Sequence, residues 1–301
     1  MINLAPLILT KNPRTNFSLT PQLIHGNMLV TYKGLPSLFF LEDNMRFFDT
    51  HAHIGLIFDD PIEQHVVCQR AAQADVKHIV SISNSIIDFF TIHGNLKIEN
   101  NVCFAAGISP SEVNNLPKDW YLKVEEAIKL PNIVALGEIG LDYFHKFGDK
   151  NRQVELFISQ LDMAIHHNLP VIIHNRDAGN DVLEVLRDRL PSRGGVLHCY
   201  SENAEYAKKA LDLNLYFSFA GNLTYRNARN LHETVQVLPL DRILVESEAP
   251  FMVPAEYRNR RNKPEYIHST VEALAELIDK PYEEVAETVY NNACKFFGIT
   301  D

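Results

Sequence analysis

The chain of 301 residues is poor in cysteine, the residue that staples small secreted folds. Its four cysteines, Cys68, Cys103, Cys199 and Cys294, include no C-x-x-C pair. That spacing suits neither a zinc knuckle nor a disulfide framework. We therefore expect reduced thiols and a cytoplasmic protein.

Positive charge and long apolar runs are also scarce. Lys and Arg number 28 against 38 Asp and Glu, a formal net charge of −10 with neutral histidine. This balance excludes a broad basic surface as the main means of holding nucleic acid. Apolar runs such as Ser37–Leu41 and Ile133–Leu136 are too short to span a bilayer. The N-terminus lacks the basic segment of a secretory signal, so we expect no membrane partner.

What the chain does have is a repeating order of segments. From residue 46 onward, short β-branched or aromatic runs alternate with stretches of helical spacing, such as Gln153–His167. Most of the short runs are apolar throughout, which is typical of a parallel sheet covered by helices. The expected strands are Arg46–Thr50, Val76–Ser83, Val102–Gly107, Ile133–Glu138, Pro170–His174, Gly195–Cys199, Leu215–Gly221 and Arg242–Glu246.

Eight β-then-α units in about 250 residues predict an α/β fold, a single (β/α)₈ TIM-like barrel. A doubly wound open sheet is the alternative. It normally carries a glycine-rich phosphate turn after its first strand. Here the first strand is followed by Asp49-Thr50-His51-Ala52-His53, which has no glycine.

The two ends of the chain do not share this alternation. Pro264–Asp279 and Pro281–Phe297 are predicted to form two C-terminal helices. Residues 1–45 form an N-terminal extension in our interpretation, with a strand-like run at Met28–Tyr32 and an apolar run at Leu35–Leu41. We therefore divide the chain into residues 1–45, the extension, and residues 46–301, the barrel.

Histidine is abundant, with 13 residues, and several stand at the ends of predicted strands together with acidic residues. A single such histidine is more often a hydrogen-bonded core residue than a ligand. The repeated placement at the rim where barrel active sites are built indicates a site instead. The set is His51 and His53 after the first strand, Glu138 after the fourth, His174 after the fifth, His198 after the sixth, and Glu246 and Glu248 after the eighth.

These residue types indicate metal binding. The spacing of His51 and His53 places two imidazoles on the same side of an extended chain. Imidazole with carboxylate suits Zn²⁺ and other first-row divalent ions, whereas Mg²⁺ prefers oxygen. The set is larger than one tetrahedral site needs. We therefore predict two divalent ions (Mg²⁺, Mn²⁺ or Zn²⁺) that share Glu138. His145, in the loop after the fourth strand, could also line the site.

Several segments together resemble the TatD-related metal-dependent deoxyribonucleases of the amidohydrolase-type barrel superfamily. The similarity runs from Phe47 to about Gly298. The segments that carry it are FDTHAH (residues 48–53), GEIGLDY (137–143), LPVIIHNRDA (169–178), HCYS (198–201) and Arg258-x-x-x-Asn262-x-Pro264.

The resemblance implies a role for each ligand. His51, His53 and the acid after the eighth strand would hold one ion, His174 and His198 would hold the second, and Glu138 would bridge them. It also implies Mg²⁺-dependent nuclease activity on DNA.

Three departures from the family pattern bear on the substrate. Glu248 stands where the family usually has aspartate. Ser109 and Ser111 stand where it usually has two histidines, and Glu202 stands where a glycine is common. The metal ligands are kept, but the residues expected to face the substrate differ.

The leading hypothesis is a metal-dependent hydrolase, a deoxyribonuclease that cleaves phosphodiester bonds at DNA ends. Glu248 would orient the attacking water and accept its proton, and Glu138 would act beside it. Arg176, Arg258 and Asn262 are predicted to contact the substrate, which is DNA or another phosphodiester. Two alternatives remain: an ester or amide hydrolase, such as an aminoacyl-tRNA deacylase, and a barrel that only binds.

Overall fold

The computed structural model describes residues 45–300 in full and residues 19–24 and 27–32 as backbone. The chain divides into Met1–Asn44 and Met45–Asp301, each described by itself. In the first unit, β1 (Leu19–Ile24) and β2 (Asn27–Tyr32) pair antiparallel. β2 confirms the predicted strand at residues 28–32. The apolar run at residues 35–41 lies outside the described residues, and the division into extension and barrel domain stays a prediction.

The second unit is built on eight parallel strands that neighbour one another in chain order. Two backbone hydrogen bonds, from the Glu248 N–H to the His51 carbonyl (2.9 Å) and from the His53 N–H to the Ala249 carbonyl (2.8 Å), join the first strand to the segment after the last. The sheet is a nearly closed (β/α)₈ barrel, as predicted. Its strands are β3 (Phe47–Ala52), β4 (Val76–Ser81), β5 (Val102–Ala106), β6 (Ile133–Asp142), β7 (Val171–Arg176), β8 (Gly195–Leu197), β9 (Tyr216–Phe219) and β10 (Ile243–Val245).

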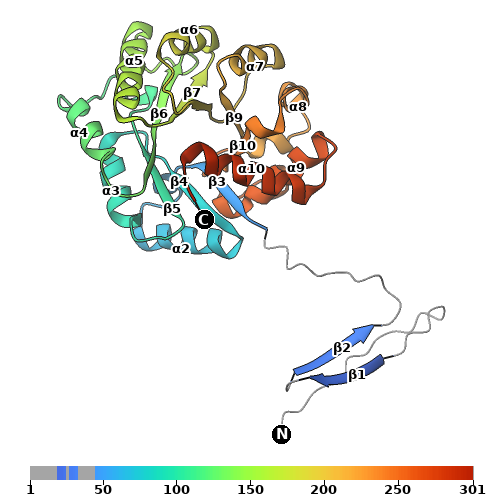
Figure 1. The fold of residues 1–301 in the computed structure, drawn as a ribbon. Coiled ribbons are helices and arrows are strands. Elements are labelled where there is room, and N and C mark those ends of the chain that lie inside the picture. Colours follow the sequence, from blue (N-terminus) through green and yellow to red (C-terminus); the bar gives the residue numbers. More distant parts are fainter. Residues whose placement is uncertain (1–18, 25–26, 33–44, 301) are drawn as a thin grey trace. The chain divides into compact units, whose positions relative to one another are not determined.

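Helices surround the ring of strands (Figure 1). In the described part of the chain, none of them combines the length and apolar character needed to cross a bilayer. The α-helices are α1 (Ile54–Ile57), α2 (Pro61–Gln73), α3 (Ile86–Leu96), α4 (Trp120–Ala127), α5 (Lys150–His167), α6 (Gly179–Arg189), α7 (Ala204–Leu211), α8 (Arg229–Val235), α9 (Ile267–Leu277) and α10 (Tyr282–Phe297). Short 3₁₀ turns are η1 (Pro110–Glu112), η2 (Gly221–Thr224), η3 (Leu240–Arg242), η4 (Ala255–Tyr257) and η5 (Pro264–Tyr266).

The helix ends follow from local chemistry. The carboxylate of Asp60 accepts hydrogen bonds from the first turn of α2, and Asp149 does the same for α5. Helix α5 ends at Asn168 and α10 at Gly298, both in the left-handed conformation (φ 53° and 73°) that stops a helix. The two predicted C-terminal helices are confirmed as α9 and α10.

Alternate residues along the strands pack on opposite sides of the barrel wall, as a period of two requires. Outward residues join the large core under the helices. A smaller cluster holds one or more residues from every barrel strand together with Tyr290, Ala293, Phe296 and Phe297 of α10. The Phe297 ring stacks on Phe48 (5.4 Å between centroids) and the Phe296 ring lies 5.0 Å from Tyr216. Because Phe48 and Tyr216 are near strand starts, α10 closes the end of the barrel opposite the mouth.

Three strands run further than the sequence indicated. The first barrel strand was expected to end at Thr50, but β3 continues to Ala52. The fourth barrel strand was expected to end at Glu138, but β6 continues to Asp142. The fifth was expected to end at His174, but β7 continues to Arg176. Strands β6 and β7 remain paired with each other up to Asp142 and Arg176, although the apolar residues of each strand end earlier. Glu138 and His174 therefore lie inside paired strands, where the backbone fixes their direction.

At the mouth of the barrel, the side chains of two buried glutamines of α5 make hydrogen bonds with backbone groups at the ends of strands. The Gln160 side-chain amide accepts from the Ile108 N–H (2.8 Å) and donates to the Ile108 carbonyl (3.0 Å). Gln153 makes the same pair of hydrogen bonds with the Asp142 backbone (2.8 and 2.9 Å). These bonds hold the ends of β5 and β6 to the helix layer and satisfy backbone groups that would otherwise be buried without partners.

Replacement of Gln160 by alanine should lower the free energy of unfolding by about 2–4 kcal/mol, because two buried backbone groups lose their partners and a cavity forms. Denaturant unfolding followed by circular dichroism measures the change. The exposed Gln73→Ala, at the end of α2, is the matched control and should shift stability by less than about 0.5 kcal/mol. Equal effects of the two substitutions would contradict this account of Gln160.

Candidate metal centre

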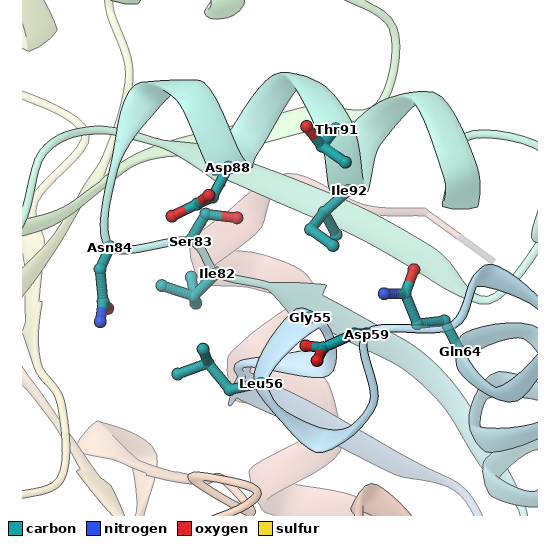
Figure 2. Close-up of a pocket in the computed structure, with 10 residues that line it drawn as sticks. All are labelled: Gly55, Leu56, Asp59, Gln64, Ile82, Ser83, Asn84, Asp88, Thr91 and Ile92. Carbon is teal, nitrogen blue, oxygen red and sulfur yellow. The ribbon is translucent and has the colours of Figure 1, made fainter.

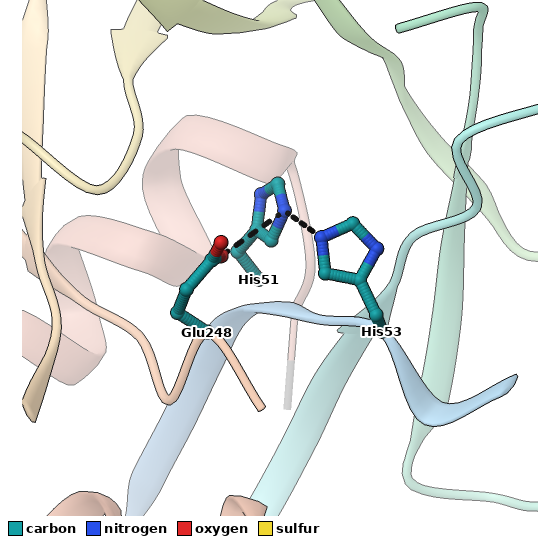
Figure 3. A group of neighbouring side chains, drawn as sticks. All are labelled: His51, His53 and Glu248. Carbon is teal, nitrogen blue, oxygen red and sulfur yellow. Dashed lines mark hydrogen bonds and ion pairs between the residues drawn. The ribbon is translucent and has the colours of Figure 1, made fainter. Parts of the chain in front are cut away.

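All six predicted ligand side chains meet at the mouth of the barrel. They come from β3 and the residue after it (His51, His53), from β6 (Glu138), from β7 (His174), and from just beyond β8 (His198) and β10 (Glu248). Figure 3 shows His51 between the Glu248 carboxylate and the second imidazole of the H-x-H pair. Residues nearly 200 positions apart in the sequence thus face one space, and beside them the Ser247 N–H donates to the carboxylate of Asp49, 198 positions earlier in the chain.

The carboxylate of Glu138 lies between two pairs of histidines. Its Oε1 is 2.8 Å from His174 Nδ1 and 3.4 Å from His198 Nε2. Its Oε2 is 3.7 Å from His51 Nε2 and 3.8 Å from His53 Nε2. Each oxygen therefore faces a different pair of imidazoles.

Glu248 lies on the side of the centre where the barrel closes. Its Oε2 is 3.4 Å from His51 Nε2 and 3.7 Å from His198 Nδ1. Its backbone has a positive φ of 55°, and its N–H donates to the His51 carbonyl. The same hydrogen bond that joins the ends of the sheet thus brings this carboxylate to the first histidine.

Two further carboxylates contact the histidines at the ring nitrogen that does not face Glu138. Asp142 Oδ2 is 3.1 Å from His174 Nε2 and 2.8 Å from His145 Nδ1. Glu246 Oε1 is 3.5 Å from His198 Nδ1. A carboxylate on the second nitrogen of a ligating imidazole fixes the ring and raises its basicity.

The H-x-H histidines are held in the neutral form. Burial lowers the pKa of His51 well below its usual value, and the neighbouring His198 and His53 lower it further. Burial also lowers the pKa of His53 to about 4. At neutral pH both rings therefore offer a lone pair, which is the form that binds a metal ion.

The buried carboxylates of the centre, by contrast, lie close to other charged groups, which shift their pKa values. Burial raises the pKa of Glu248 to about 8; His198 opposes the rise, and the nearby carboxylates of Glu246 and Glu138 add to it. Burial also acts to raise the pKa of Glu138, but contacts with His198 and His174 outweigh it and hold that pKa well below its usual range. A cation placed among these groups would relieve the excess of negative charge.

The donor set fits a divalent metal ion. Among the described residues, three groups place one ligand atom per residue within 4.8 Å of one another: His51, His53 and Glu248; His51, Glu138 and His198; and His198, Glu246 and Glu248. Buried polar atoms among them without a hydrogen-bond partner include Glu248 Oε2 and Glu246 Oε2. Buried oxygens of this kind require a partner, and neutral imidazoles with carboxylates are what first-row divalent ions prefer.

A cavity of about 460 Å³ lies over this centre. Arg176 lines it, as predicted for a substrate contact, and so does His145. Arg258 is exposed and is not part of the lining. Asn262 is only 1% exposed, and its amide donates to the Ser247 and Phe251 carbonyls, both at 2.6 Å. Contact of these two residues with substrate stays a prediction.

Some residues of the site carried no separate signal in the sequence. Asp142 lies in a motif that pointed to the site, but nothing local marks it as the partner of His174. Glu246 was in the predicted set, but its contact with His198 Nδ1 (3.5 Å) depends on tertiary packing. Ser109 and Ser111 were noted as departures, and both line the cavity, with the Ser111 hydroxyl donating to Ser109 Oγ (3.2 Å).

A parallel barrel with buried histidines and carboxylates at its carboxyl-terminal mouth is the architecture of a metal-dependent hydrolase. The chain belongs to the TatD-related DNase family, whose model matches residues 48–298.

Relatives and a solved structure agree with this assignment. The chain is 35% identical over 257 residues to the uncharacterized metal-dependent hydrolase YabD of Bacillus subtilis (strain 168), covering 84% of this chain and 99% of that protein. It is also 35% identical to the uncharacterized metal-dependent hydrolase YcfH of Escherichia coli (strain K12), covering 83% and 95%. The crystal structure of YJJV, a TatD homologue from Escherichia coli K12, aligns with a TM-score of 0.79 at 28% identity, covering 85% of this chain and all of that one.

Binding of a divalent ion should stabilise the protein through Glu138. At an ion concentration 100 times the dissociation constant, the gain is about 2.7 kcal/mol, read as a rise in the thermal midpoint that a chelator reverses. Glu138→Gln should abolish most of this rise with Mn²⁺ or Zn²⁺. The matched control is Glu99→Gln, which alters a His–Glu pair outside the centre (His65 Nδ1 to Glu99 Oε1, 2.6 Å) and should keep it. A rise of the same size in both variants would place ion binding elsewhere.

Proposed function

We propose that this protein is a two-metal-ion phosphodiesterase that cleaves single-stranded DNA from an end. The observation that supports it best is the division of the Glu138 carboxylate between two histidine pairs, since one oxygen for each pair is the arrangement a bridging ligand needs. Two ions held a few ångströms apart are typical of enzymes that cleave phosphodiesters.

The chain's own residues divide the remaining work. Bound divalent ions supply a deprotonated water at neutral pH and neutralise charge on a phosphoryl oxygen. Glu248 orients the water, because its Oε2 is buried beside His51 and receives no hydrogen bond from the described residues. Glu138 keeps the two halves of the centre at a fixed separation. Asp142 holds His174 by its second ring nitrogen.

Arg176 is placed to hold the phosphate. Among the residues lining the cavity it is the only lysine or arginine. Its guanidinium lies 4.9 Å from the Phe144 ring centroid, which supports the side chain from one face. Its buried Nε has no hydrogen-bond partner among the described residues. A guanidinium with free donors pairs well with phosphate oxygens.

An exposed aromatic ring at the mouth favours a strand with unpaired bases. Phe251 lines the cavity, is 50% exposed, and lies edge-on to His53 with 6.1 Å between ring centroids. Proteins that hold single strands stack successive bases on such rings, and a duplex has no free base face to offer.

A second candidate function is hydrolysis of an ester or amide. The hydroxyls of Ser109 and Ser111 on the cavity wall favour it, since they give the wall hydrogen-bonding groups in place of the two imidazoles usual in the family. The same metal chemistry serves carbonyl centres, so the choice rests on relative rates.

Purified protein should degrade short single-stranded DNA with Mg²⁺ or Mn²⁺ and stop when a chelator is added. His174→Ala should lower the rate at least about 100-fold, because it removes a predicted ligand and one contact each of Glu138 Oε1 and Asp142 Oδ2. His65→Ala, which breaks the pair outside the centre, should keep the rate. Product release from labelled oligonucleotides is the measurement.

Two outcomes would contradict the proposed function. One is faster hydrolysis of aminoacyl or simple carboxylic esters than of every DNA strand, which would favour the second candidate. The other is DNA cleavage that survives His174→Ala undiminished, which would show that the activity comes from elsewhere.

Phe251→Ala should weaken the use of DNA but spare the chemistry. Loss of a stacked base predicts a fall in kcat/KM on oligonucleotides of about 5- to 150-fold. The rate on bis(p-nitrophenyl) phosphate, a phosphodiester without bases, should change much less. Tyr121→Ala, which removes a ring 46% exposed on α4, is the control. A parallel loss on both substrates would assign Phe251 a structural role instead.

A further inference from the structure

A second cavity of about 250 Å³ adjoins the metal cavity, and we call it the side pocket. Figure 2 shows its lining side chains around one space, with α3 on one side and the segment at residues 55–59 on the other. The residue Asn84, in the turn after β4, lines both the side pocket and the metal cavity. A substrate held at the metal centre can therefore place its neighbouring group in the side pocket.

The lining of the side pocket repels phosphate. It includes the carboxylates of Asp59 and Asp88 and contains no lysine or arginine. A phosphate bound there would meet negative charge without compensation. The sugar-phosphate backbone is therefore not what this pocket takes. Aliphatic side chains on its walls, Leu56, Ile82 and Ile92, instead suit an apolar ring face.

One carboxylate in the side pocket is free to accept hydrogen bonds from a ligand. No described residue donates to the Asp59 side chain, whereas Asp88 Oδ2 already accepts from Ser85 Oγ (2.7 Å). The amide of Gln64 is also used, since it donates to the Phe58 carbonyl and accepts from another side chain. Asp59 is thus the carboxylate of the side pocket whose two oxygens can both accept hydrogen bonds from a ligand.

We propose that the side pocket binds the guanine base next to the scissile phosphodiester, an inference that rests on the proposed nuclease function. Guanine alone among the DNA bases has two adjacent donors on its pairing edge, N1–H and the 2-amino group, and these match the two oxygens of one carboxylate. In adenine and cytosine the exocyclic amine lies beside a ring acceptor, and in thymine a single N–H lies between two carbonyls. Such edges are readable only in unpaired strands.

The test uses five-nucleotide oligothymidylates in which one thymine, at each position in turn, is replaced by guanine, adenine, cytosine or hypoxanthine. At one position relative to the cut, guanine should raise the initial rate about 10-fold or more over adenine, the size of one bidentate base contact. Hypoxanthine, which lacks the 2-amino group, should lose most of that advantage. The measurement is product formation by mass spectrometry with Mn²⁺ present.

Two variants assign the effect to the pocket. Asp59→Asn should remove the guanine advantage and leave the rate on oligothymidylate unchanged, because Asp59 is exposed and outside the metal centre. The matched control is Glu63→Gln, an exposed charge in the first turn of α2 that does not line the pocket; it should keep the advantage. Thr91→Phe, which fills the pocket from α3, should also remove it.

The outcomes separate this inference from the function on which it rests. Equal rates for all bases, or a guanine advantage that survives Asp59→Asn, overturn the role of the side pocket and leave the nuclease function standing. Absence of cleavage for every oligonucleotide overturns both. A guanine advantage lost only in Asp59→Asn and Thr91→Phe supports the assignment.

Discussion

The seam at which β3 meets the segment after β10 is the constraint on which the metal centre depends. The Asp49 carboxylate is buried there and accepts hydrogen bonds from the Ser247 N–H (2.8 Å) and the His51 N–H (3.3 Å). Burial raises the pKa of this carboxyl to about 7, against the lowering effect of Ser247. Since the seam also carries the Glu248-to-His51 backbone bond, the contacts that close the barrel also bring Glu248 to His51.

Charge balance is the second constraint on the same site. Glu138, Asp142, Glu246 and Glu248 are all at most 9% exposed, and the imidazoles between them contribute positive charge only when protonated. Burial keeps the H-x-H pair neutral, so these two histidines do not offset the charge of Glu248, and only His198 acts against it. A bound cation is the compensation that such a cluster needs. The formal net charge of −10 thus overstates how strongly the mouth of the barrel repels a phosphate.

Most of the fold and of the candidate site was predictable from the sequence. The features that were not predictable depend on contacts between distant parts of the chain. Strands of a parallel barrel are buried on both faces, so they read as apolar runs, and all eight were found. The side chains predicted as ligands lie together at one rim, because the carboxyl ends of parallel barrel strands meet there. The ends of β3, β6 and β7 were misplaced, since pairing between strands continues to Ala52, Asp142 and Arg176. Partners such as Asp142 for His174 depend on tertiary contact, which no local spacing encodes.

In the proposed function, the part of the site that sets the chemistry is separate from the part that sets selectivity. Ligands lie in or directly after paired strands, where backbone hydrogen bonds leave little freedom. The side pocket is lined by residues from the segments after β3 and β4 and from α2 and α3. Loops and helix faces of this kind tolerate substitution far better than paired strands. Changes at Asp59 or Thr91 can therefore alter which group lies beside the scissile bond, while Glu138 and its histidines keep the same geometry.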